Sequence, residues 1–86
     1  MQATMSQFSI QIQAMGILKD YLGSGPFDLQ VPQGAGVEYL LKWVRQNPLV
    51  HPDLTIAVVN DNQFCSLDVL LKEQQLYYII PPVSGG

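Results

Sequence analysis

One amphipathic helix pattern lies between strand patterns, and this order constrains the fold more than any other feature of the sequence. Its apolar residues recur at spacings of three and four, on Val37, Leu40, Leu41 and Val44. Gly36 is a candidate N-cap, and Asn47-Pro48 ends the helix, because the residue before a proline is pushed out of the α region. A helix here allows the right-handed crossover that joins two parallel strands.

Alternation of apolar and polar residues predicts the strands. Phe8, Ile10, Ile12 and Ala14 alternate with Ser9, Gln11, Gln13 and Met15, the period of a half-buried strand. A second alternation at 27–31 predicts a strand that returns antiparallel beside the first. The other expected elements are a helical turn at 17–22 closed by Gly23, a turn at 23–26, a buried strand at 55–59, a turn at 60–62, a short extended segment at 63–66, a local turn at 67–71 and a last strand at 76–80.

These elements predict an α+β fold, a mixed sheet with one main helix packed across it. The last strand is expected to lie parallel to the first in the middle of the sheet. With 86 residues the chain is one small domain, since such a chain buries only roughly 60% of its unfolded surface. We expect a flexible N-terminus at 1–7, the folded domain at 8–80 and an extended tail at 81–86.

The composition excludes several classes of function. Only 13% of the residues are charged, against about 25% in an average soluble domain, and 48% are hydrophobic, which suggests a surface covered by a partner. The four cations are spread along the chain, which argues against nucleic acid and membrane partners. The absence of a secretion signal pattern and of a long apolar run favours the cytoplasm. One cysteine, Cys65, and one histidine cannot form a disulfide or a structural zinc site, so no metal is expected.

The last strand pattern leads directly into Ile80-Pro81-Pro82-Val83-Ser84-Gly85-Gly86, where the sequence ends. Neither proline can donate to a sheet ladder, so the strand should stop at Pro81. The six residues after the strand can reach roughly 20 Å at about 3.3–3.6 Å per residue. Glycine lets another backbone approach closely, so we expect a tail that can enter a narrow channel of a partner.

Three segments resemble the sulfur-carrier small subunit of molybdopterin synthase. They are Val59-Asn60, Leu71-Lys72 before the final strand, and the ending Ile-Pro-Pro-Val-Ser-Gly-Gly. The resemblance covers 8–86 and implies the ubiquitin-like β-grasp fold, which agrees with the predicted element order. The chain departs from the family pattern in the turn before the last strand, where the family commonly has a Gly-Asp turn and this chain has Glu73-Gln74-Gln75. A second departure is at Ala14 and Met15, where the family's first strand often ends in Phe.

The resemblance implies that the carboxylate of Gly86 carries the sulfur. An E1-like adenylyltransferase would adenylate Gly86 with ATP, and a sulfur donor protein would then displace AMP to leave a thiocarboxylate. The large subunit of molybdopterin synthase would receive the tail, which donates sulfur to cyclic pyranopterin monophosphate. Gly85 would give access, and Pro81, Pro82, Val83 and Ser84 would set reach and stiffness. The resemblance implies a heterotetramer in which the partners supply the catalytic groups, and no tightly bound cofactor.

The alternation in the first and last strands predicts where a partner binds. If Tyr77 and Ile79 point toward the helix, Tyr78 and Ile80 point to the opposite face, and so does Met15. With Phe64 these residues would form an apolar partner-binding patch beside the tail, in the positions where the family resemblance places the large subunit. The alternative is that Phe64 and Ile80 belong to the core.

Other functions remain open at this point. One alternative is a sulfur carrier for thiamine or another pathway, or a ubiquitin-like modifier of proteins. A second is a β-grasp interaction module without tail chemistry. We expect Cys65 to be a small buried hydrophobe rather than an essential thiol, because no cation or helix start lies near it in the sequence.

Overall fold

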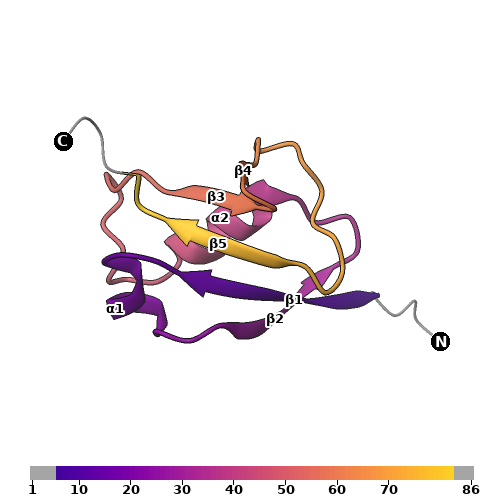
Figure 1. Ribbon diagram of the computed structural model, residues 1–86, viewed down its shortest axis with the longest axis horizontal. Helices are drawn as coiled ribbons and strands as arrows, with labels where there is room; N and C mark the ends of the chain where they lie inside the picture. The colour runs from indigo at the N-terminus through magenta and orange to yellow at the C-terminus, as the bar shows by residue number, and fades with distance from the viewer. Residues whose placement is uncertain (1–5, 83–86) are drawn as a thin grey trace.

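The computed structural model describes residues 6–82, which form one sheet with two helices (Figure 1). The elements follow in the order β1 (Gln7–Ala14), α1 (Leu18–Leu22), β2 (Phe27–Pro32), α2 (Val37–Arg45), β3 (Ala57–Asn60), β4 (Gln63–Phe64) and β5 (Leu76–Ile80). This order confirms the predicted one, including the short helical turn α1 and its end at Gly23.

The strands form a mixed sheet in the order β2-β1-β5-β3-β4. β2 returns antiparallel to β1, and β5 lies parallel to β1 and antiparallel to β3. The last strand therefore occupies the centre of the sheet, as predicted. α2 lies behind the sheet in Figure 1 and covers one of its faces, which we call the inner face. The opposite, outer face is the one turned toward the viewer.

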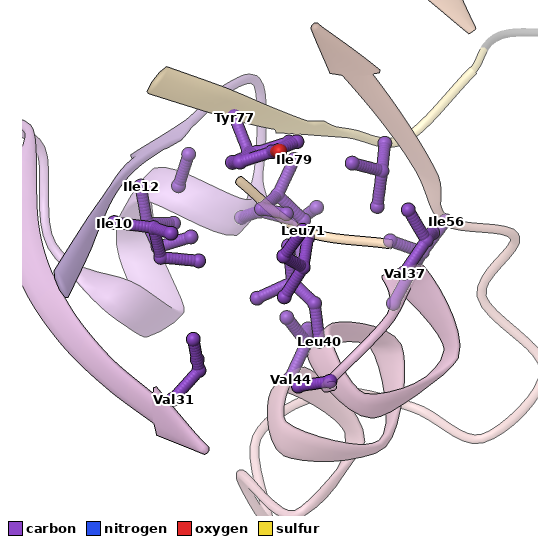
Figure 2. Close-up of a cluster of buried hydrophobic side chains, with 14 of the residues drawn as sticks. Ile10, Ile12, Val31, Val37, Leu40, Val44, Ile56, Leu71, Tyr77 and Ile79 are labelled. Carbon is purple, nitrogen blue, oxygen red and sulfur yellow. The ribbon is translucent and has the colours of Figure 1, made fainter. Parts of the chain in front are cut away.

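The core lies between the inner face and α2, where side chains from the strands and the helix converge (Figure 2). The four apolar residues of the alternation in β1 are all buried, and so are Val37, Leu40 and Val44 of α2. Leu41, predicted on the same stripe, is only half-buried at its margin. Each Val, Leu, Ile or Phe side chain that is fully buried contributes about 1.5–3 kcal/mol of transfer free energy. The helix is thus held to the sheet by its apolar face.

The N-terminus of α2 is capped by the backbone of the loop that follows β4. The N–H of Val37 donates to the carbonyl oxygen of Val69 at 2.8 Å, and that of Glu38 donates to Leu67 at 3.3 Å. These bonds satisfy donors that have no partner within a helix. A Cβ on Gly36 would lie 3.0 Å from the Val69 carbonyl oxygen. The predicted N-cap is confirmed, and glycine is needed there for this close approach.

The structure corrects several predicted boundaries: β2 ends at Pro32 rather than at residue 31, and β3 ends at Asn60 rather than at residue 59. β3 begins at Ala57 rather than at residue 55, because Ala57 is opposite Ile80 and the two preceding residues would face Pro81 and Pro82. β4 ends at Phe64 rather than at residue 66. β1 begins at Gln7, which is opposite Pro32, so the expected flexible N-terminus does not include Gln7.

Candidate functional site

β5 brings the base of the predicted tail to one end of the sheet. The strand ends at Ile80, Pro81 is half-buried and Pro82 is exposed. Val83, Ser84, Gly85 and Gly86 lie outside the described residues, so the roles expected for them stay predictions. Because β5 is the central strand, the chain leaves the sheet from between two hydrogen-bonded neighbours, β1 and β3.

The outer face beside this exit is apolar. Tyr77 and Ile79 are buried against the core, which confirms their predicted inward orientation, whereas Tyr78 is 37% exposed and Ile80 half-buried. Phe64 is 69% exposed, so the alternative that it belongs to the core is wrong. Met15 is 36% exposed.

The strand register brings these residues together. Val59 of β3 is opposite Tyr78 on one side and opposite Phe64 on the other, so the three side chains form a row on the outer face. Ile80 lies next along β5, and Met15 follows directly after Ala14, which is opposite Ile79. We call the set Met15, Val59, Phe64, Tyr78 and Ile80 the outer apolar patch. All four residues predicted to bind a partner lie in it.

Val59 was missed at the sequence level because residues 55–59 read as one continuous apolar strand. The structure buries Val58 and leaves Val59 half-buried on the other face. The signal that identifies it is the register of β3 on β5, since a residue opposite the outward Tyr78 must itself point outward.

The strands around the patch carry almost no charge. β1, β3, β4 and β5 contain no charged residue, and Asp28 is the one charged residue of edge strand β2. Asp28 is opposite Gln11 in the middle of β1, and it lines a polar hollow of about 310 Å³ together with Ser9, Gln11 and Gln74. The outer face is therefore apolar beside the exit of the chain and polar away from it.

The remaining side chains with metal-binding groups do not gather into one cluster in the part of the chain that the structure describes. Within residues 6–82 no group of three His, Cys, Asp or Glu side chains is placed to hold a metal ion. Cys65 is half-buried and packs against the core. His51 is exposed, and its Nδ1 atom accepts a hydrogen bond from the N–H of Asp53 at 3.0 Å, a local turn contact. In the part of the chain that the structure describes, no helix is long and apolar enough to span a membrane.

No protein-family model matches the chain, and no curated protein sequence matches it significantly. Solved structures do. SAMP1 from Haloferax volcanii is 22% identical with a TM-score of 0.71, and the match covers 91% of this chain and 99% of that one. A Pyrococcus furiosus protein provisionally described as molybdopterin converting factor, subunit 1 is 15% identical with a TM-score of 0.76 and coverages of 88% and 99%.

A Caldiarchaeum subterraneum ubiquitin is also similar. It is 17% identical with a TM-score of 0.67, and the match covers 94% of this chain and all of that one. These matches show that the chain has the ubiquitin-like β-grasp fold, as the resemblance of its motifs implied.

Proposed function

We propose that this ubiquitin-like chain is a sulfur carrier of molybdenum cofactor biosynthesis, the small subunit of a molybdopterin synthase, with Gly86 as its C-terminal residue. The observation that carries the proposal is the position of the Pro-Pro-Val-Ser-Gly-Gly segment. The segment begins at Pro81, which follows the central strand directly where that strand carries the outer apolar patch, in a fold shared with a protein described as a molybdopterin converting factor subunit.

In this proposal the chemistry takes place on the Gly86 carboxylate. An E1-like enzyme transfers AMP from ATP to one carboxylate oxygen and releases pyrophosphate, because a free carboxylate is a poor acyl donor. A sulfide equivalent from a donor protein then displaces AMP, and the product is a thiocarboxylate. In the synthase its sulfur attacks a side-chain carbon of cyclic pyranopterin monophosphate and displaces an oxygen from that carbon, which gives a thioester. Water then cleaves the bond between the Gly86 carbonyl carbon and the sulfur, so the sulfur stays on the pterin and Gly86 returns to a carboxylate. The groups that catalyse these steps belong to the partners.

The outer apolar patch serves in this proposal as the contact with the large subunit. The patch combines the exposed ring of Phe64 with Tyr78, Val59 and Ile80, and no charge lies on the four strands that carry or adjoin it. Aromatic side chains and the lack of charged groups are typical of the central part of a protein–protein interface. Binding there would hold the base of the tail against the partner.

A ubiquitin-like modifier is the second candidate. It is favoured by the similarity to SAMP1, described as a small archaeal modifier protein, and to a ubiquitin. A lysine amine of a target protein would then attack the activated carbonyl of Gly86 and form an isopeptide bond as the leaving group departs. Both candidates require activation of Gly86, and they differ in the nucleophile that follows.

Intact-mass measurement tests the proposal. The chain ending at Gly86 is incubated with an E1-like adenylyltransferase, ATP and a sulfur donor protein, and a variant lacking residues 85–86 serves as the control. The proposal predicts a mass gain equal to the exchange of one oxygen for sulfur in the full chain only. No gain with partners that thiolate another carrier would contradict it and would favour an interaction module without tail chemistry.

A second experiment separates the two candidates. The thiolated chain is mixed with the large subunit of molybdopterin synthase and cyclic pyranopterin monophosphate, and formation of molybdopterin is measured. Formation of the dithiolene product supports the carrier. Isopeptide bonds between Gly86 and lysines of other proteins in cells that express a tagged chain, without dithiolene formation, would support the modifier instead.

A further inference from the structure

The hydrogen-bond ladder between β1 and β5 ends where the chain leaves the sheet. It runs from the bond of the Gln11 N–H to Gln75 at one end to the bond of the Met15 N–H to the Ile79 carbonyl, 2.9 Å long, at the other. In a parallel ladder the next donor would be the N–H of residue 81, directed at the Met15 carbonyl. Residue 81 is a proline and has no N–H, so pairing stops there.

The carbonyl oxygen of Met15 instead accepts a hydrogen bond from the segment that directly follows β1. The N–H of Leu18 donates to it at 3.1 Å, and the N–H of Lys19 donates to the carbonyl of Gly16 at 3.1 Å. These bonds begin α1, whose Leu18 is fully buried in the core. β1 thus turns away into α1 at Gly16, while β5 continues as Pro81.

Gly16 makes this turn possible in two ways. Its φ of +58° lies in the left-handed region, which glycine adopts at no steric cost. Its backbone also approaches the ring of Pro81, since a Cβ on Gly16 would lie 3.0 Å from Pro81 Cγ and 3.3 Å from Cδ. The proline ring fixes its own φ, so Pro81 has little freedom to move away.

Two other glycines show that a positive φ and a close approach of another residue are separate reasons for glycine. Gly34 has a φ of +86° and Gly23 one of +106°, yet a Cβ on either would meet no atom within 4 Å. Gly34 therefore needs glycine for its backbone angle alone, whereas Gly16 needs it both for its angle and for the space taken by Pro81.

We propose that Gly16 is a positioning residue. Because it has no Cβ, the ring of Pro81 can pack directly against its backbone, and this contact sets the direction in which the chain leaves β5. The inference rests on the proposed function, because the direction of the chain affects sulfur loading only if the chain is a carrier that presents its terminal carboxylate to an activating enzyme. Residue 16 acts on the chemistry only through Pro81.

The test compares Gly16→Ala with Gly34→Ala, which shares the unfavourable φ without the contact. Sulfur loading by the E1-like enzyme is measured as kcat and KM for each variant. Gly16→Ala should lower kcat/KM by about tenfold or more, because small displacements of a reacting group are costly, and Gly34→Ala should change it by less than about twofold. The double variant Gly16→Ala/Pro81→Ala should recover the rate of Pro81→Ala alone. Equal effects of the two glycine variants, or no recovery, would overturn the proposal.

The first of two further measurements decides the contact on the wild-type chain alone, even if Gly16→Ala folds poorly or the wild-type chain takes up no sulfur; the second uses the folded variants. Nuclear Overhauser effects between the Gly16 Hα protons and the Pro81 ring protons should be present in the wild-type protein, and their absence would overturn the proposal. Residual dipolar couplings of the Cα–Hα bonds of Pro81 and Pro82 should change in Gly16→Ala and stay constant in Gly34→Ala. A wild-type chain that shows this contact but accepts no sulfur would contradict the proposed function alone.

Discussion

The hydroxyl oxygen of Tyr77 accepts a hydrogen bond from the backbone N–H of Lys72 at 2.9 Å. Tyr77 lies on the central strand β5 with only 2% of its surface exposed, and Lys72 begins the turn that leads into this strand. The bond satisfies the one polar atom of the buried ring and ties the turn to the strand. The strand that leads to Pro81 is therefore anchored at its start as well as by its neighbours.

Tyr77→Phe should destabilise the domain by about 1 kcal/mol, because the Lys72 N–H loses its acceptor while the ring stays buried. The free energy of unfolding in urea measures this change. Tyr78→Phe is the matched control on the same strand, and because Tyr78 is exposed we expect an effect within about 0.5 kcal/mol. Equal effects of the two variants would contradict a stabilising role for the Tyr77–Lys72 bond.

Stability should fall at alkaline pH because of the same phenol. Burial raises the pKa of Tyr77 above its ordinary value of 10.0; the Lys72 bond opposes this, and the electrostatic effect of the nearby Cys65 adds to it. The folded state thus holds the proton more tightly than the unfolded state. The contribution of Tyr77 to the free energy of unfolding is fully present below pH 10. It is lost as the pH rises through the pKa of the folded state, at up to about 1.4 kcal/mol per pH unit. Urea titrations from pH 8 to 11 should show this decline, and Tyr77→Phe should show a shallower one.

Gly36→Ala should destabilise the domain by about 2 kcal/mol, since the new Cβ meets a backbone oxygen, that of Val69, at 3.0 Å. Gly36 has an extended backbone, so no strain in φ contributes. Gly25→Ala is the control, because a Cβ there meets nothing within 4 Å, and it should be neutral or stabilise slightly through the unfolded state. Thermal unfolding measures both, and an unchanged midpoint for Gly36→Ala would show that the loop moves freely.

Gln74→Gly should stabilise the domain by about 0.5–1 kcal/mol. Gln74 has a φ of +63°, a conformation that costs a residue with a Cβ about 1 kcal/mol or more and glycine nothing. This turn is where the sequence departs from a Gly-Asp pattern, so the backbone keeps a conformation suited to glycine although the residue is glutamine. Gln75→Gly, at a position without positive φ, should destabilise by a similar amount. Urea unfolding of both variants checks the opposite signs.

The sequence predicted the order of the elements and two of the strand pairings, those of β2 and β5 with β1, because the patterns that carry them are local. The alternation in β1 and the helical spacing in α2 each follow from which side chains face the core. The start of β3 was missed because it depends on prolines of another strand: only the register with β5 shows that Pro81 and Pro82 would face residues 56 and 55.

The same limit applies to the candidate site. Tyr78 and Ile80 could be placed on the outer face from their own strand, but Val59 required the register, and the closeness of Gly16 to Pro81 required the end of the ladder between β1 and β5. Contacts across strands depend on offsets that no single segment of sequence contains.

Ile80→Glu tests whether the outer apolar patch binds the large subunit. Ile80 is half-buried on the outer face, so the carboxylate can reach water and the domain should stay folded. Binding to the large subunit should weaken by at least about tenfold, because an unpaired charge would be desolvated in the interface. Isothermal titration calorimetry measures the affinity, and circular dichroism measures folding.

Ile79, the residue before Ile80 on β5, supplies the control for a charge placed in the core. Ile79 is fully buried, so Ile79→Glu places an unpaired carboxylate in the core and should unfold the domain, at a cost above about 4 kcal/mol. Phe64→Ser, at the most exposed residue of the patch, should weaken binding without loss of stability. If Ile80→Glu also unfolds the domain, Ile80 belongs to the core. If Ile80→Glu and Phe64→Ser both stay folded and bind normally, the large subunit does not contact the patch.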